Sequence, residues 1–298
     1  MKQLKHLLLE LRFILLLLAV LVGIDLVLTA LAPVEQSTLF PKNDYERAVI
    51  SHDGKTSFDK VLWGNSVAGA GYLEDCSQSG YVNFGIVYGT MLDLEAELTK
   101  GYLSPGTDLV VMVNYLTFSD IISTDPSSPW HRLPLEPYVY FQRDRLMTAA
   151  ENTAKSLLET HSLSGITRYT DLSRSECHGS LSDDELDQII TAQTEQYYNK
   201  DLSYYKKNFA ATRRIIDYCQ QHGIRLRVLC APLNPYYTFD GYPAGVMDEA
   251  ITMFQESGID ILDMRDAIDR EGFYDLGHLN REVGAVQFTN AIEEWLCQ

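Results

Sequence analysis

Short apolar segments alternate with amphipathic segments along most of the chain after residue 59. The apolar segments are nearly continuous, as expected of strands that are buried on both faces of a parallel sheet. They lie at 60–63, 81–84, 109–113, 226–230 and 259–262. Helical patterns follow at 91–100, 204–222, 245–257 and 282–296. This alternation predicts an α/β fold, a three-layer α/β/α sandwich with a parallel sheet.

The alternation lapses at 117–198, a polar region rich in Ser, Pro and Tyr. A segment of this length is too long for a simple loop and too polar for core strands. It includes the stretch DELDQIITAQ, which has helical character. We therefore expect a mostly helical insertion that shapes a substrate cleft.

The beginning of the chain has a different pattern, with a long apolar run at 13–31 that contains one ionisable residue, Asp25. At about 1.5 Å per residue, this run is long enough to cross the ~30 Å hydrocarbon layer of a membrane. Ala30-Leu31-Ala32 has the form of a signal-peptidase site, but the following Pro33 should hinder cleavage. We therefore expect residues 1–33 to be an uncleaved membrane anchor.

Basic residues precede the apolar run, at Lys2, Lys5 and Arg12. The positive-inside rule then places the N-terminus in the cytoplasm and the rest of the chain outside. The polar stretch 34–58 has no sustained periodicity and is expected to be a tether to a folded domain at 59–298. The sequence thus predicts a single-pass protein of the cell membrane with an extracytoplasmic domain.

The formal net charge of −17 narrows the range of partners. Proteins bind nucleic acids mainly through Lys and Arg side chains, and a chain this acidic repels the phosphates. Nucleic-acid binding is therefore excluded. The five cysteines include no C-x-x-C pair and no histidine at a chelating spacing, so no metal site is expected. An extracytoplasmic location permits disulfides, but the sequence does not decide whether any form.

A serine among glycines follows the first predicted strand, in the segment VLWGNSVAGAGY at 61–72. Ligands of open parallel sheets bind at the carboxyl ends of the strands, and glycines leave a short side chain exposed there. We therefore expect Ser66 to be a nucleophile. The segment also begins a G-x-G-x-x-G pattern, but Glu74 takes the place of the third glycine. No dinucleotide or other cofactor is expected.

A serine hydroxyl attacks an acyl carbon only with the help of a general base, which itself needs an orienting partner. The segment FYDLGHLN at 273–280 offers Asp275 and His278, close enough in sequence for their side chains to meet. The carboxylate would hold the imidazole in one tautomer. Such a pair also occurs in ordinary surface turns, but its position after the last predicted strand favours a catalytic role.

Four short blocks in this order resemble those of the SGNH/GDSL hydrolase superfamily. They are GNS at 64–66, the glycine that ends VNFG at 82–85, the asparagine that ends VVMVN at 110–114, and DLGH at 275–278. The resemblance covers most of 59–298 and implies a flavodoxin-like sandwich. A family member would carry Ser66 as nucleophile, with His278 and Asp275 as base and orienting carboxylate.

The same resemblance implies an oxyanion hole that is formed by the N–H groups of Ser66 and Gly85 and by the amide of Asn114. Three positions depart from the family pattern. Asn65 stands where the first block usually has Asp, and in the third block, usually G-x-N-D, Met112 stands for the Gly and Tyr115 for the Asp. Asn114 could instead satisfy backbone groups at the end of its strand, so both roles remain open for it.

The C-terminal segment FYDLGHLNREVGAVQFT, together with the predicted anchor, resembles SGNH-like proteins that act on cell-envelope polymers. These include the D-alanyl transfer protein of the teichoic-acid pathway and accessory acetyltransferases of exopolysaccharide synthesis. Such proteins work beside a multi-spanning membrane-bound O-acyltransferase. The resemblance implies O-acyl transfer to a polysaccharide or teichoic acid, or hydrolysis of such esters. A non-catalytic envelope protein that binds polysaccharide or scaffolds the membrane complex is the alternative.

Two further features bear on substrate and partner. Asn234, Tyr236 and Tyr237 follow the strand predicted at 226–230, on the sheet edge that carries Ser66, and tyrosines offer flat surfaces for sugars. We expect these residues to line the substrate cleft. A carboxylate inside a membrane costs about 2.5 kcal/mol or more at the bilayer centre. Asp25 therefore either docks on a polar group of the membrane partner or is hydrated near the outer headgroups.

Overall fold

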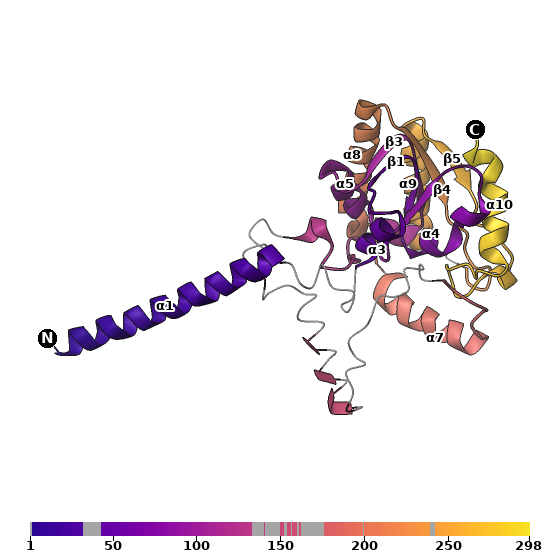
Figure 1. Cartoon of the computed structure of the whole chain (residues 1–298). Coiled ribbons are helices and arrows are strands. Elements are labelled where there is room, and N and C mark those ends of the chain that lie inside the picture. The colour runs from indigo at the N-terminus through magenta and orange to yellow at the C-terminus, as the bar shows by residue number, and fades with distance from the viewer. Residues whose placement is uncertain are drawn as a thin grey trace. The chain divides into compact units, whose positions relative to one another are not determined.

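The protein is described by a computed structural model (Figure 1). The residues described are 2–31, 43–132, 140, 150–151, 154–155, 157–159, 161, 176–198, 200–238 and 242–298. The chain divides into two compact units. One consists of residues 1–43 and 126–171, and the other of residues 44–125 and 172–298.

The second unit is built on a five-stranded sheet in the order β2-β1-β3-β4-β5. The strands are β1 (Ser57–Gly64), β2 (Val82–Gly85), β3 (Ser104–Val113), β4 (Arg225–Cys230) and β5 (Asp260–Asp263). All neighbouring strands are parallel. This is the strand order of flavodoxin-like doubly wound folds. The α/β fold with a parallel sheet that the sequence predicts is therefore confirmed.

Helices cover both faces of the sheet (Figure 1). One face carries α5 (Met91–Thr99), α8 (Lys206–His222) and α9 (Tyr242–Glu256), and the other carries α4 (Ser66–Gly71) and α10 (Gly284–Leu296). Strand residues such as Leu62, Val110 and Leu229 pack with Phe288 and Ile292 of α10 in one buried cluster. Alternate residues of the same strands face opposite layers, so both faces are apolar.

Short helical turns also occur in the described part of the chain. They are η1 (Glu74–Cys76), η2 (Tyr115–Phe118), η3 (Pro129–His131), the π-helical turn η6 (Thr194–Tyr198), η7 (Leu202–Tyr205) and η8 (Arg270–Gly272). Within the insertion expected at 117–198, the structure describes one longer helix, α7 (Asp183–Gln193). A capping box formed by Ser182 and Glu185 starts it. Most of 133–175 lies outside the described residues.

The folded unit begins earlier than the sequence indicated. Helix α3 (Asp44–Ser51) lies within the stretch 34–58 that was expected to be a tether. It buries Tyr45 and Ala48, and the Tyr45 hydroxyl donates a hydrogen bond to the Tyr102 carbonyl at 2.9 Å. A helix of eight residues shows too little periodicity to be recognised from its pattern, and this contact with a distant residue holds it in place.

The first unit contains the N-terminal helix α1 (Lys2–Leu31). Its segment Leu11–Leu31 is long and apolar enough to cross a membrane, a criterion that a signal sequence also meets. Asp25 within this segment is buried and accepts a hydrogen bond from the backbone N–H of Tyr140, in the same unit. A partner for this carboxylate is therefore present within the chain.

Arg227 is the largest charged side chain in the buried core, with 1% of its surface exposed. Its guanidinium lies 3.2 Å from Asp108 of β3 and donates to the Leu296 carbonyl at 3.3 Å. It also lies over the Trp295 ring, 4.4 Å from the centroid. Arg227 thus joins β3, β4 and the C-terminal end of α10, where the helix carbonyls carry partial negative charge.

Replacing Arg227 with alanine should lower the free energy of unfolding by about 3–5 kcal/mol, because Asp108 would stay buried without its close partner. Arg225→Ala is the matched control on the same strand. Arg225 is 47% exposed and lies 3.8 Å from Asp108, so its loss should cost ~1 kcal/mol or less. Urea unfolding of the full chain in detergent measures both changes, and equal losses would contradict this account.

Candidate active site

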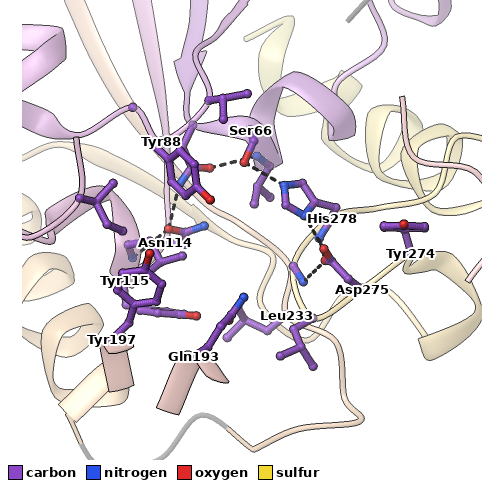
Figure 2. Close-up of a pocket in the computed structure, with 18 of the residues that line it drawn as sticks. Ser66, Tyr88, Asn114, Tyr115, Gln193, Tyr197, Leu233, Tyr274, Asp275 and His278 are labelled. Atoms are coloured by element: carbon purple, nitrogen blue, oxygen red, sulfur yellow. Dashed lines mark hydrogen bonds and ion pairs between the residues drawn. The ribbon is translucent and has the colours of Figure 1, made fainter. Parts of the chain in front are cut away.

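The expected catalytic side chains meet at the carboxyl edge of the sheet (Figure 2). Ser66 begins α4 directly after β1, and Asn114 follows β3, the neighbour of β1. Asp275 and His278 lie in the loop between β5 and α10. Helices leave β1 and β3 toward opposite faces, which opens a crevice at this point of the sheet. A pocket of about 370 Å³ lies there and is lined by all four residues.

Ser66, His278 and Asp275 form a continuous hydrogen-bonded chain. The Ser66 Oγ lies 2.8 Å from His278 Nε2, and His278 Nδ1 lies 2.8 Å from Asp275 Oδ2. A carboxylate only accepts hydrogen bonds, so Nδ1 carries the ring proton and Nε2 is left to accept from the serine hydroxyl. This is the arrangement that makes a serine nucleophilic.

The environment of Asp275 keeps it ionised. Burial raises the pKa of Asp275, but the hydrogen bond and charge of His278 lower it, as do two backbone N–H groups. These belong to Gly277 and His278 and donate to Oδ1 at 2.9 and 2.7 Å. The favourable contacts outweigh burial, so the pKa lies below its ordinary value. Asp275 can therefore stabilise an imidazolium at His278.

Asn65 sets the orientation of Asn114. Its Nδ2 donates to Asn114 Oδ1 at 3.0 Å, and its own Oδ1 accepts from the Val67 N–H at 3.0 Å and caps α4. The Asn114 oxygen also accepts from the backbone N–H groups of Leu116 and Thr117. With its oxygen occupied, Asn114 has only its NH₂ group to offer the pocket. An Asp at position 65 could not donate to that oxygen, so Asn65 suits this arrangement.

Gly85 does not reach the pocket, contrary to the expected oxyanion role. Its N–H donates to Asn83 Oδ1 at 3.0 Å, and it is not among the residues that line the pocket. A Cβ at Gly85 would lie 2.4 Å from the Gly69 nitrogen, so this glycine is where β2 touches the backbone of α4. The glycine serves close packing, and of the three expected oxyanion donors only Ser66 and Asn114 line the pocket.

Asn234, Tyr236 and Tyr237 are also absent from the lining, although they were expected to form a wall of the cleft. Asn234 is buried, and its Nδ2 donates to the Asp275 carbonyl at 2.8 Å. The Tyr236 hydroxyl donates to Asp187 of α7 at 2.9 Å, and Tyr237 stacks on Tyr198 of η6. A turn at Asn234 directs both tyrosines away from the pocket, which receives Pro232 and Leu233 of this loop.

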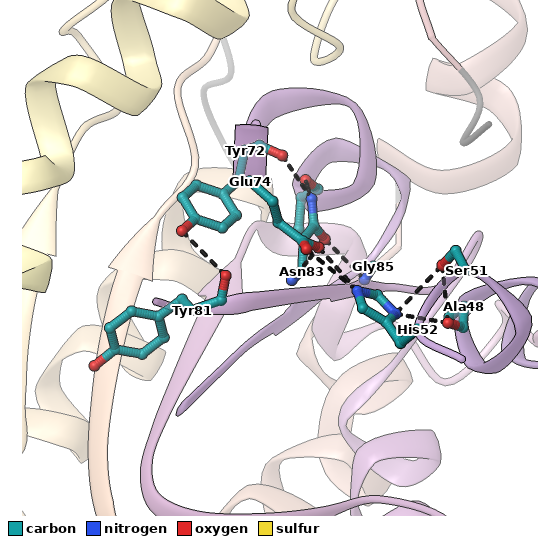
Figure 3. Close-up of polar contacts among 9 residues, drawn as sticks. Ala48, Ser51, His52, Tyr72, Glu74, Tyr81, Asn83 and Gly85 are labelled. Carbon is teal, nitrogen blue, oxygen red and sulfur yellow. Dashed lines mark hydrogen bonds and ion pairs between the residues drawn. The ribbon is translucent and has the colours of Figure 1, made fainter. Parts of the chain in front are cut away.

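A polar network that the sequence analysis missed holds α4 in place (Figure 3). Asn83 is fully buried in β2 and donates from Nδ2 to the carbonyls of Ala68 and Tyr72, at 3.0 and 2.7 Å. Its own N–H donates to Glu74 Oε1 at 2.7 Å, and this oxygen lies 3.1 Å from His52 Nε2. Asn83 is a polar residue inside the otherwise apolar strand β2, and this sequence feature could have predicted the network.

Several lining residues had no sequence signal. They include Tyr88, Gln193, Tyr197, Tyr274 and Cys177. Burial and the nearby Asp275 raise the pKa of Cys177 to about 11, so its thiol is protonated near neutral pH. All five cysteines are free. In the described part of the chain, no group of His, Cys, Asp and Glu side chains could hold a metal ion.

Asp275→Asn should change the pH dependence of stability in a defined direction. A carboxyl whose pKa falls on folding stabilises the protein above its unfolded value of about 3.9, and this contribution is lost as the pH falls through the lower folded pKa. The difference in unfolding free energy between wild type and variant should therefore be largest above about pH 5 and shrink in acid. Urea unfolding from pH 7 to pH 3 measures it, and a difference that grows in acid would refute the assignment.

Comparisons with known proteins do not assign a function to this chain, so the geometry of the site has to indicate it. No family model and no curated protein matches the chain. Ten chains of solved structures match it, among them a "putative acylhydrolase" from Bacteroides fragilis. That protein is 13% identical with a TM-score of 0.41, and the alignment covers 89% of this chain and 93% of the other.

Proposed function

We propose that the protein is a membrane-anchored serine O-acyltransferase or esterase that forms an acyl-enzyme on Ser66. The observation that carries this proposal is the chain of two 2.8 Å contacts from Ser66 Oγ through His278 to Asp275 Oδ2, in the lining of a pocket. An Asp and a His in an ordinary surface turn would have no need of a serine. Here the His278 ring contacts the hydroxyl of Ser66, which lies more than two hundred positions away in the sequence.

In the first half-reaction, Ser66 Oγ attacks the acyl carbon of an ester and His278 Nε2 takes the hydroxyl proton. Asp275 stabilises the resulting imidazolium. Ser66 is the first residue of α4, so no earlier carbonyl of the helix accepts a hydrogen bond from its N–H. This N–H and the NH₂ group of Asn114 hold the oxyanion. His278 then gives its proton to the departing alcohol oxygen.

In the second half-reaction, a hydroxyl or a water attacks the acyl group on Ser66, and His278 again acts as base. The acyl–Oγ bond breaks and Oγ recovers the proton. Apolar side chains dominate the pocket and suit the hydrocarbon part of an acyl group. They are Val67, Val87, Leu116, Ile122, Pro232, Leu233 and Leu276.

The acceptor is a hydroxyl of a cell-envelope polysaccharide or teichoic acid, and a multi-spanning membrane-bound O-acyltransferase supplies the acyl group. Support comes from the apolar helix at Leu11–Leu31 and from the basic residues that precede it. The catalytic unit then lies outside the cytoplasmic membrane as part of a single-pass protein. An enzyme that modifies envelope polymers needs this placement.

Fluorophosphonate labelling of the full chain in detergent, followed by mass mapping, tests the enzyme proposal. We expect labelling at Ser66, none in Ser66→Ala, and labelling slower by roughly 10³-fold or more in His278→Ala. His178→Ala is the control, because His178 is exposed and contacts Glu176 and Glu282 outside the pocket. A folded protein that is not labelled at Ser66 would instead support a non-catalytic, polysaccharide-binding role.

The proposed topology predicts which cysteines react from outside the cell. Cys76 and Cys297 are exposed, so a membrane-impermeant maleimide should label both in spheroplasts, and labelling should fall sharply in a Cys76→Ser/Cys297→Ser variant. The labelled protein should stay in the membrane pellet after carbonate washing and retain residues 1–33 by mass. Labelling only after lysis would overturn the orientation, and a mass that begins after Ala32 would overturn the anchor.

A further inference from the structure

Tyr88 has an unusual backbone at the pocket. It lies between β2 and α5 with φ at +57°, a conformation that side-chain-bearing residues rarely adopt. Its side chain is 53% exposed, so burial does not account for the strained position. The next residue closes a tight turn, in which the Gly89 N–H donates to the Ile86 carbonyl at 2.8 Å. Strained residues of this kind concentrate where a ligand binds.

Tyr197 and Gln193 line the same pocket from a different part of the chain, the π-helical turn η6 and the end of α7 (Figure 2). The Tyr198 hydroxyl donates to Gln193 Oε1, which leaves the Gln193 NH₂ group for the pocket. Burial raises the pKa of Tyr197, and the nearby Tyr88 adds to this rise. The hydroxyls of Tyr88 and Tyr197 have no hydrogen-bond partner within the described ranges.

The segment that carries Gln193 and Tyr197 is anchored to the sheet edge. Tyr198 meets Tyr115 edge to face at 5.4 Å and stacks on Tyr237 at 5.8 Å. The Tyr236 hydroxyl holds α7 through its hydrogen bond to Asp187, and the Arg270 guanidinium lies over the Tyr236 ring, 4.6 Å from the centroid. The tyrosines after β4 thus hold the pocket wall in position without lining it, and the wall is preorganised for binding.

We propose that Tyr88, Gln193 and Tyr197 form an acceptor subsite that binds the ring of a neutral sugar and presents one of its hydroxyls to the acyl group on Ser66. Tyrosine rings offer apolar faces to the C–H groups of a sugar and hydroxyls to its oxygens, and the Gln193 amide adds a donor. Among the described lining residues there is no Lys or Arg to bind a phosphate. A neutral glycan therefore fits better than a phosphodiester polymer.

This inference rests on the proposed function and specifies its acceptor. The sugar oxygen attacks the acyl carbon, and its proton passes to His278 Nε2. The bond between the acyl carbon and Ser66 Oγ breaks, and Oγ takes the proton from His278. The sugar leaves as an ester, and the enzyme returns to its starting state with no further reactant.

The test uses the full chain in detergent with p-nitrophenyl acetate as acyl donor. The burst of p-nitrophenolate reports acylation of Ser66, and the following steady rate reports deacylation. Methyl glycosides of glucose, galactose, mannose and N-acetylglucosamine serve as acceptors, with butanol and glycerol 3-phosphate as comparisons. We expect at least one glycoside to raise the steady rate with saturation and to appear as its acetate by mass spectrometry.

Tyr88→Gly, Tyr197→Ala and Gln193→Ala should each raise the half-saturating glycoside concentration by about tenfold, a larger effect than on the burst. Tyr88→Gly also removes the backbone strain, so weaker acceptor binding in a protein that is no less stable separates binding from folding. Tyr204→Ala, which changes an exposed tyrosine outside the pocket, should match the wild type.

Four results would overturn the subsite. A burst without saturation by any glycoside would reject it while the acyl-enzyme stands, and so would saturation by glycerol 3-phosphate alone. Equal effects of the variants on burst and half-saturation would show a structural role for these residues. If no p-nitrophenolate is released at all, in a burst or in the steady phase, the proposed function and the subsite are rejected together.

Discussion

The parallel arrangement of β1 and β3 is the constraint on which the site depends. Both strands end at the same edge, and their following helices leave toward opposite faces of the sheet. Side chains that follow the two strands, Ser66 and Asn114, therefore face one crevice from two sides. The loop after β5 then has only to reach this crevice to bring His278 within 2.8 Å of Ser66.

Buried asparagines hold the separate parts of this site together. Asn83 binds the carbonyls of α4, Asn234 binds the carbonyl of Asp275, and Asn65 binds the side chain of Asn114. Each joins segments that are far from one another or differently structured, and each is almost fully buried. A buried amide that lost its partner would cost about 1–3 kcal/mol, so these contacts make the arrangement specific.

The lining of the pocket differs in charge from the chain as a whole, and this difference indicates which substrates suit it. The chain is strongly acidic, yet the described lining holds one carboxylate, Asp275, which is engaged with His278. Apart from the His278 imidazole and the Cys177 thiol, the rest of the described lining is apolar or carries neutral hydroxyl and amide groups. Such a pocket favours an uncharged ester and an uncharged acceptor, since no buried charge then has to lose its water.

The sequence by itself determined the fold class and the chain positions of Ser66, Asp275 and His278. Apolar periodicity is local, and a parallel sheet requires both its faces to be apolar, so the strands could be read directly. Only the tertiary structure decided which way the other side chains point. Gly85 ends β2 and Asn234 follows β4 at the same edge, but the Gly85 N–H donates to Asn83 and the Asn234 side-chain amide donates to the Asp275 carbonyl. Tyr88, Gln193 and Tyr197 come together because packing between distant segments places them there, and no local pattern records such packing.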